Sequence, residues 1–332
     1  MADVAAEMNE PPRLVVVGEL CVDLVVGLSD EAIRFGQHEQ IVPFTTLTMG
    51  SSSAITACGA AALGVPTTMV GVRGDDEFGT YIDRELSARG VDVSFVRIDR
   101  SLPTGSSTHL TRPDGDRAIL TAMGSIGRTT AGDVTEVLLH GAAHLHGGSY
   151  FLQEALWGEA PALFARARAA GLSTSLDGNF DPSERWDRGI LAVLAQCDVF
   201  FGNEQELRGI TGAHDLDAAV ESVLDRMPSG ALVVCKLGGA GAAVSWREDG
   251  IIRTIRAATP DAPGALVDTV GAGDSLAAGF LAGRLTGESV EGCLRLGVAC
   301  GTASTRGPGG VGAQPSRAEA DALAARVPVA TP

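Results

Sequence analysis

Short apolar runs that end in small or polar residues alternate with longer helical patterns along most of this chain. Residues 142–148, 172–178, 197–203 and 231–239 each have the pattern of a buried strand that runs into a loop. The segments between them have the length and spacing of helices. This alternation predicts βαβ units and an α/β fold with a mostly parallel central sheet and helices on both faces. In such sheets, ligands bind beyond the carboxyl ends of the strands.

The rest of the chain differs from this pattern in three places. Residues 92–123 form short alternating runs broken by proline and by an Asp-Gly step, which predicts hairpin strands without a helix. Residues 1–12 are polar and end in Pro-Pro, so we expect a disordered tail there, and a second tail at 326–332. The length of 332 residues then fits one large domain over residues 13–325.

Charge and composition exclude several classes of protein. The net charge is −16 and Lys236 is the only lysine, which disfavours binding to nucleic acid or to anionic membranes. The chain shows neither a transmembrane run nor a signal-peptide pattern. The six cysteines are scattered and mostly lie in apolar runs, which indicates buried free thiols in a reducing cytosol rather than disulfides or a zinc site. We therefore expect a cytoplasmic protein that acts on small molecules.

The most informative motif is DTVGAGDSLAAGFLAG, at residues 268–283. Its glycines permit a tight turn before an apolar helix. The backbone amides of Gly271, Ala272 and Gly273 would then point into the turn at the positive end of the helix, where a phosphate binds well. Asp274 follows as the first residue of the predicted helix. The motif thus predicts an anion site beside a carboxylate.

The two carboxylates of this motif separate two interpretations. Asp274 alone could be a helix cap, which contributes about 1 kcal/mol. A cap needs one carboxylate, however, and this interpretation leaves Asp268 without a role. A phosphate site beside a carboxylate instead indicates phosphoryl transfer to a hydroxyl group. An aspartate is a weak base, but it suffices because the proton leaves late in a loose transition state.

The motif resembles the C-terminal signature of the ribokinase-like (PfkB) carbohydrate kinases. Further stretches resemble the family in the family's order, from about residue 13 to 320: GELCVDLV (18–25), VGVRGDDEFGTYIDRELSARGVD (70–92), GNEQELRGITG (202–212), VVCKLGGAGAAV (233–244) and TRGPGG (305–310). The resemblance implies a ribokinase-like fold with a small β-strand lid from parts of residues 20–48 and 92–123. In several members this lid also pairs two subunits, so we expect a homodimer.

The resemblance also implies roles for individual residues. Asp274 would be the general base, and the amides of residues 271–273 would form the anion hole. Substrate contacts would come from Asp23, Gly50 and Ser51, although a lone aspartate at such a place is otherwise an ordinary turn residue. The positions that match nucleotide-binding positions of the family are Asn203, Glu206, Lys236, Gly238, Gly241 and Gly273.

Two ions are implied by the resemblance. Asn203 and Glu206 would position Mg²⁺ and the ATP phosphates, usually through water. The same N-E-Q-E stretch also fits a capping box at the start of a helix, and the sequence leaves both interpretations open. Asp268 and Thr269 match positions that in many members support a monovalent cation such as K⁺.

Two departures from the family pattern bear on the substrate. Ile55 replaces the asparagine that follows the opening of the substrate helix, which removes a polar contact. Asp181 stands where the family's D-x-N-x-R has arginine, so a phosphorylated substrate is disfavoured. The arginines that remain as candidates for an acidic sugar are Arg112, Arg117 and Arg128.

The predicted function is ATP- and Mg²⁺-dependent phosphorylation of a hydroxymethyl group of a neutral sugar. A nucleoside kinase of the adenosine type, on the same fold, is the alternative within the family. A silent sugar or nucleotide sensor would have no use for the base in GAGD. A serine hydrolase built on GSSSA (50–54) lacks the second glycine of the nucleophile turn.

Overall fold

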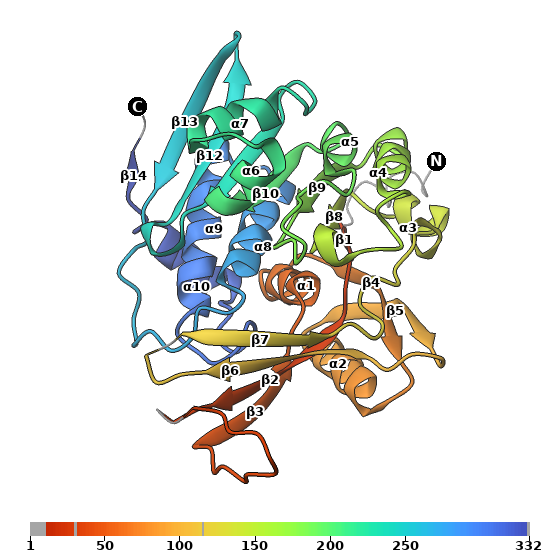
Figure 1. Ribbon diagram of the computed structural model, residues 1–332. Coiled ribbons are helices and arrows are strands. Elements are labelled where there is room, and N and C mark those ends of the chain that lie inside the picture. The colour runs from red at the N-terminus through yellow and green to blue at the C-terminus, as the bar shows by residue number, and fades with distance from the viewer. Residues whose placement is uncertain (1–10, 30–31, 115, 331–332) are drawn as a thin grey trace.

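The computed structural model describes residues 11–29, 32–114 and 116–330. Residues 1–10 of the predicted N-terminal tail (1–12) therefore lie outside the described residues. Within the described part, the chain forms a ten-stranded sheet and a separate four-stranded sheet (Figure 1). The strands of the large sheet, in spatial order, are β14 (Val329–Ala330), β13 (Ile251–Ala257), β12 (Ala242–Glu248), β11 (Leu232–Lys236), β10 (Val199–Asn203), β9 (Ser173–Asp177), β8 (His144–Gly147), β1 (Leu14–Val17), β4 (Thr67–Gly74) and β5 (Val91–Asp99).

The strands from β5 to β11 in this order all run parallel to one another. Valine recurs in β1 and β4, and these two strands are buried along their whole length, as expected for a sheet covered on both faces. The prediction of a mostly parallel sheet is confirmed. The antiparallel edge formed by β12, β13 and β14 was not predicted.

Helices cover both faces of the large sheet. Because side chains alternate along a strand, Phe201 of β10 packs into one core and Phe200 into the other. The first core contains residues of α1, α2, α8, α9 and α10, and the second contains residues of α3 to α7. The helices are α1 (Ser52–Ala62), α2 (Glu77–Ala88), α3 (Glu136–His140), α4 (Ala160–Ala169), α5 (Ile190–Leu194), α6 (Glu204–Thr211), α7 (Leu216–Leu224), α8 (Ala272–Leu285), α9 (Val290–Ser304) and α10 (Arg317–Ala324), with short 3₁₀ turns at η2 (Ala131–Asp133), η3 (Tyr150–Leu152) and η4 (Gly238–Ala240).

The small sheet is the lid. Its strands are, in order, β3 (Phe44–Met49), β2 (Cys21–Gly27), β6 (Gly105–Thr111) and β7 (Arg117–Ala122). In Figure 1 these strands lie together below α1, apart from the large sheet. Asp23, Ser107 and Thr121 stand opposite one another on β2, β6 and β7, so they share one face of the lid.

Two predicted boundaries are wrong. Residues 91–99 form β5, which extends the large sheet beside β4 and is not part of the lid. Its position at the sheet edge leaves many of its side chains partly exposed, which produces the alternating pattern of a hairpin strand. The expected tail at 326–332 contributes β14, whose residues 329–330 pair with the open edge of β13.

All six cysteines are free and buried, so the prediction that these thiols are buried is confirmed. Among the described residues, none of the helices is both long enough and apolar enough to cross a membrane.

Candidate active site

The glycine turn, residues 268–273, leads directly into α8. Gly271 is the N-terminal cap residue of this helix, with a left-handed φ of 70°. A Cβ at this position would lie 2.6 Å from the Cα of Gly310, so glycine is required for both reasons. Gly273 lies in the first turn of α8, where backbone amides have no partner within the helix. Backbone amides at this end of the helix are therefore without partners inside α8, and the Ala272 amide donates to the Thr269 carbonyl at 3.4 Å.

Asp274 is the third residue of α8, not the first, and its side chain is not the helix cap. Its Oδ1 instead accepts a hydrogen bond of 2.5 Å from the hydroxyl of Ser52, the first residue of α1. Burial, and after it the nearby Asp177 carboxylate, raise the pKa of Asp274 to about 7, although Lys236 and the hydrogen bond from Ser52 act in the opposite direction. A carboxyl group whose pKa lies near neutral pH can both accept and release a proton there, which is the property that general acid–base catalysis uses. Ser52 was not predicted from the sequence.

Lys236 lies beside the same turn. Its Nζ donates hydrogen bonds to both carboxylate oxygens of Asp177, at 2.8 and 3.1 Å. A Cβ built on Gly273 would lie 3.1 Å from the Cδ of Lys236, so the lysine stem runs directly along the turn. Burial alone would lower the pKa of this lysine, but Asp177, Glu206 and Asp274 raise it, and the side chain is charged.

Asn203 and Glu206 form a capping box at the start of α6. The Asn203 side-chain oxygen accepts from the Glu206 amide at 2.9 Å, and the Glu206 carboxylate accepts from the Asn203 backbone at 2.9 Å. Asn203 stands opposite Lys236 where β10 and β11 end, so the box lies beside the glycine turn. The capping-box interpretation of this stretch is therefore confirmed. It leaves the Glu206 carboxylate near the glycine turn. Gly238 is the first residue of the following 3₁₀ turn η4, and Gly241 is its C-terminal cap residue.

The described residues contain no group of three or more histidine, cysteine, aspartate or glutamate side chains suited to hold a metal ion. Magnesium commonly keeps several water ligands and binds through substrate phosphates with one or two carboxylates. Glu206 is a hard oxygen donor of this type, and it lies in the first turn of α6, which directly follows β10. The donor set fits an ion that arrives with a nucleotide.

Among the predicted substrate-binding residues, Asp23 of β2 is buried and lies over Gly50, where an added Cβ would come within 2.3 Å of its Oδ1. The Nε2 of His109 on lid strand β6 is 3.5 Å from the same oxygen. Its Nδ1 has no hydrogen-bond partner among the described residues. His109 was missed because a lone histidine in a short strand carries no motif. Asp23, Gly50 and His109 come together as one group.

The hydroxyl of Ser51 is used by the fold. It caps α1 by accepting from the Ala54 amide at 3.0 Å and donates to the Glu19 carbonyl at 2.5 Å. Ile55, which replaces the family's asparagine, packs against Gly271 and Gly310 instead of presenting a polar group. This departure exchanges a polar contact for support of the glycine turn.

A buried carboxylate that was not predicted, Glu19, lies next to the start of α1. Glu19 follows β1 and accepts hydrogen bonds from the hydroxyls of Ser53 at 2.5 Å and Ser149 at 2.8 Å. Asn179 donates to the Ser149 hydroxyl in turn, at 2.9 Å. The network joins the ends of β1, β8 and β9 to the start of α1. The signal in the sequence that could have revealed this network is a glutamate close to the end of an apolar strand.

Asp268 holds the glycine turn to the closing loop at residues 305–310. Its carboxylate accepts from the Val270 amide and from the Gly309 amide, each at 3.0 Å. Arg117 of lid strand β7 lies 3.8 Å from Asp268 Oδ1 and donates to the Thr269 hydroxyl at 3.2 Å. Asp268 therefore links three segments, which answers why the motif needs a second carboxylate.

Asp181, which stands where the family pattern has arginine, anchors its own loop. Its carboxylate accepts from the amides of Ser183 and Trp186 at 2.9 and 2.7 Å. The side chain is buried by these contacts, so it faces the fold and not a substrate phosphate.

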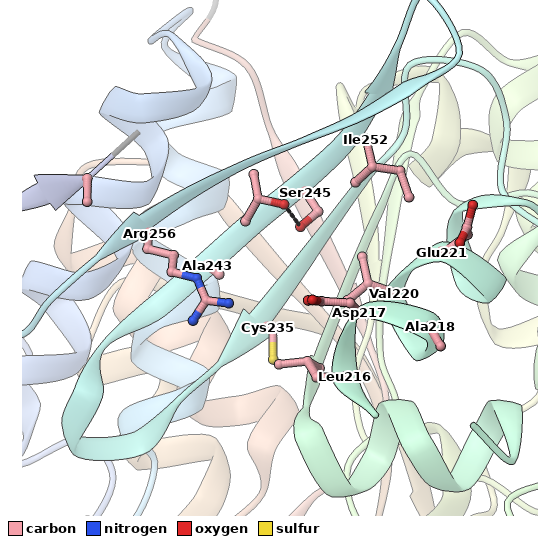
Figure 2. A pocket seen from close by; sticks show the side chains of 12 residues that line it. Leu216, Asp217, Ala218, Val220, Glu221, Cys235, Ala243, Ser245, Ile252 and Arg256 are labelled. Carbon is pink, nitrogen blue, oxygen red and sulfur yellow. Dashed lines mark hydrogen bonds between the residues drawn. The ribbon is translucent and has the colours of Figure 1, made fainter. Parts of the chain in front are cut away.

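A hollow of about 570 Å³ lies elsewhere, between α7 and strands β11 to β13 (Figure 2). Figure 2 shows Cys235 at its floor and Arg256 at its side. Cys235 belongs to the second core, whereas its neighbour Lys236 turns to the opposite face of the sheet, toward Gly273. This hollow is therefore separate from the glycine turn.

The chain was compared with known proteins. A family model described as pfkB family carbohydrate kinase matches residues 11–317. The chain is 34% identical over 277 residues to the ATP-dependent ribose-1-phosphate kinase of Halopiger xanaduensis, which covers 83% of this chain and 85% of that protein. It is 30% identical over 321 residues to the 2-dehydro-3-deoxygluconokinase of Thermoproteus tenax, with 93% of each covered.

Among solved structures, the ribokinase of Arabidopsis thaliana, complexed with ribose and ATP, matches the fold with a TM-score of 0.79 at 24% identity. That match covers 95% of this chain and 98% of the ribokinase. The large sheet and separate lid thus define a protein of the ribokinase fold. The chain belongs to the pfkB family of carbohydrate kinases. The predictions of the fold and of an ATP-dependent carbohydrate kinase are confirmed.

Proposed function

We propose that the protein transfers the γ-phosphoryl group of ATP to a hydroxymethyl group of a neutral sugar. The observation that carries this proposal is the position of Asp274, whose carboxylate lies at the first turn of α8 beside the glycine turn. Asp274 accepts the hydroxyl proton as the sugar oxygen bonds to phosphorus, and the bond to the β-phosphate oxygen breaks to release ADP. The amides of Gly271, Ala272 and Gly273 stabilise charge on the transferred group.

The nucleotide side of the site is built from the ends of β10 and β11. In the proposal, the loop around Gly238 and Gly241 lies against the nucleotide. Asn203 and Glu206 position Mg²⁺ through water, and the ion neutralises charge on the phosphates when it is bound.

Asp23, Gly50 and the backbone of Ser51 contact sugar hydroxyls, with His109 above them on the lid. A neutral sugar is favoured because Asp181 is committed to its own loop and leaves no arginine there. A sugar 1-phosphate is the second candidate, favoured by the 34% identity to the ribose-1-phosphate kinase. A nucleoside is the third.

The test is coupled ADP release with Mg-ATP against neutral sugars, sugar 1-phosphates, 2-keto-3-deoxy sugar acids and nucleosides, with and without K⁺. Turnover that requires one neutral sugar supports the proposal and names the substrate. Turnover that requires a sugar phosphate or a nucleoside would show that the acceptor belongs to that class and is not a neutral sugar. A K⁺ effect supports a cation site at Asp268 and Thr269. ATP binding without any turnover would favour the sensor.

We also propose that two copies of the chain form a homodimer through their lids. We further propose that the protein is cytoplasmic. Leu24, Leu47 and Leu120 share the lid face opposite Asp23, and they are 37%, 38% and 60% exposed. An apolar face of this kind suits a second copy of the lid. Sedimentation of wild type and Leu120→Glu tests the pairing, and a monomeric wild type contradicts it. The six buried free cysteines support the reducing location.

A further inference from the structure

Three consecutive serines lie at the start of α1, in the stretch GSSSA. The hydroxyl of Ser51 caps the helix, and that of Ser53 donates to the Glu19 carboxylate at 2.5 Å. The hydroxyl of Ser52 points to a different element and donates to Oδ1 of Asp274 in α8, at 2.5 Å. Three neighbouring hydroxyl groups thus have three different partners, and one of these partners is the base of the proposed reaction.

The contact from Ser52 occupies only one of the two carboxylate oxygens of Asp274. The other oxygen, Oδ2, accepts no hydrogen bond from the described residues, and Asp274 is only partly buried. A carboxylate with one oxygen held and the other free has a defined direction from which a proton can arrive. The free oxygen is the one left for a substrate hydroxyl.

The packing of α1 against α8 does not depend on this hydrogen bond. Thr56, one turn further along α1, donates to the backbone carbonyl of Asp274 at 3.3 Å. A Cβ on Gly59 would come within 2.7 Å of the Cβ of Ala278, so the two helices are also in close contact beyond their first turns. We therefore expect that removal of a single hydroxyl group at the start of α1 leaves this packing intact.

The position of Ser52 connects the base to one side of the site. Gly50, two residues before Ser52, belongs to the acceptor side of the proposed site. Gly273, one residue before Asp274, lies against Lys236 on the nucleotide side. The ammonium of Lys236 attracts the Asp274 carboxylate. The hydrogen bond from Ser52 opposes rotation of the carboxylate toward this ammonium, and so keeps the base on the acceptor side.

The same hydrogen bond changes the charge of the base. Burial raises the pKa of Asp274 most, followed by Asp177 at the end of β9, and Glu19 after β1 adds a smaller effect in the same direction. Lys236 at the end of β11 and the hydrogen bond from Ser52 lower it. A hydroxyl donor favours the ionised form of a carboxyl group, which is the form that accepts a proton.

We propose that Ser52 is a positioning residue for phosphoryl transfer, which holds Oδ1 of Asp274 and leaves Oδ2 to accept the proton of the substrate hydroxyl. That proton moves to Oδ2 as the hydroxyl oxygen bonds to the γ-phosphorus and the bond to the β-phosphate oxygen breaks. The Ser52 proton stays on the serine. This inference rests on the proposed function and adds to it the residue that orients the base.

The first experiment needs no substrate. The carboxyl ¹³C resonances of labelled aspartate are titrated in wild type, Ser52→Ala and Ser52→Thr, and the Asp274 signal is the one absent from Asp274→Asn. We expect Ser52→Ala to raise the pKa of Asp274 by about one unit, because a hydrogen bond to the charged form is lost. Ser52→Thr keeps the hydroxyl group and should restore the wild-type value. An unchanged titration in Ser52→Ala overturns the inference.

Kinetics then measure the effect on turnover, with Mg-ATP and the acceptor that supports ADP release. Ser52→Ala should lower kcat about tenfold at pH 7 with KM for ATP unchanged, since the base is oriented less well and is more often protonated. The acid side of its kcat/KM profile should move to higher pH by about one unit. Wild-type kcat together with a wild-type profile would contradict the proposal.

Ser101→Ala is the matched control for both experiments. It removes a serine hydroxyl that donates to another aspartate, Asp99, at 2.6 Å on the exposed surface. The pKa of Asp274, kcat and the kcat/KM profile should all be those of wild type. Loss of activity in this control to the same degree as in Ser52→Ala would assign both losses to general destabilisation and overturn the inference.

The double variant Ser52→Ala/Asp274→Asn distinguishes positioning of the base from support of the fold. If Ser52 acts through the carboxylate, its removal should lower kcat no further once that carboxylate is gone. Equal losses in the two backgrounds would show that Ser52 does not act through Asp274. If the wild type turns over no acceptor, the proposed function fails, and the titration still shows whether Ser52 controls the ionisation of Asp274.

Discussion

The carboxyl edge of the large sheet and the inner face of the lid both bring charged side chains to one site, but they do so differently. At the sheet edge, Asp177, Lys236 and Asp274 are tied by short hydrogen bonds to neighbouring strands and helices. On the lid, His109 and Asp23 are 3.5 Å apart, and one nitrogen of the histidine has no partner among the described residues. We infer that the edge is preorganised for chemistry and that the lid selects the acceptor.

The largest expected effect tests the edge. Asp274→Asn should lower kcat by roughly 10²–10⁴-fold while ATP binding is retained, because the proton acceptor is removed and the turn is not. Steady-state kinetics and calorimetry measure the two quantities. Asp261→Asn, an exposed site, is the control and should behave as wild type. A kcat for Asp274→Asn near that of wild type would remove the base from the mechanism.

The pH dependence gives the next effect. Because the pKa of Asp274 is raised to about 7, kcat/KM should fall about tenfold per pH unit below pH 7. The stability sign follows from the same shift. The folded state binds the proton of Asp274 more tightly than the unfolded state, so protonation of this carboxyl group stabilises the fold. This stabilisation is fully present below the ordinary pKa and is lost as pH rises through about 7.

Asp274→Asn should therefore melt at a higher temperature than wild type above pH 7, with no difference near pH 3. Thermal unfolding at several pH values checks this difference. A flat kcat/KM profile between pH 5 and 8, or a melting difference independent of pH, would show that Asp274 titrates normally.

A smaller effect is expected at the junction of the two regions. Asp268→Asn weakens the bonds to Val270 and Gly309 and the attraction to Arg117, so the turn is held less firmly. We expect kcat to fall about tenfold, as for a positioning contact. Kinetics of Asp268→Asn, Arg117→Met and the double variant measure the coupling. Strictly additive losses would show that lid and turn act independently.

The smallest effect tests the lid. His109→Ala should raise KM for the acceptor about tenfold, in keeping with one lost hydrogen bond, and leave kcat nearly unchanged. Thr108→Ala, on the other face of the same strand, is the control and should keep the wild-type KM. A loss in kcat with unchanged KM would assign His109 to the chemistry and end the distinction between the two regions.

Local features of the sequence were enough to predict the parallel sheet and the glycine turn before α8, although they placed Asp274 at the first residue of that helix and not at the third. Strand and helix periodicities and glycine conformations depend on neighbouring residues, so they can be read along the chain. The same local pattern misplaced two segments. Residues 91–99 alternate like a hairpin strand, and only pairing with β4 shows that they extend the large sheet.

The partners across the site were decided by the tertiary structure. Ser52 reaches Asp274 from a helix 222 residues away in sequence, and Lys236 meets Asp177 across an intervening strand. The glycine turn determines where an anion can bind, whereas the packing of α1, β9 and β11 around it determines how Asp274 is charged. Burial and long-range electrostatics depend on the whole fold, and for that reason no single motif contains them.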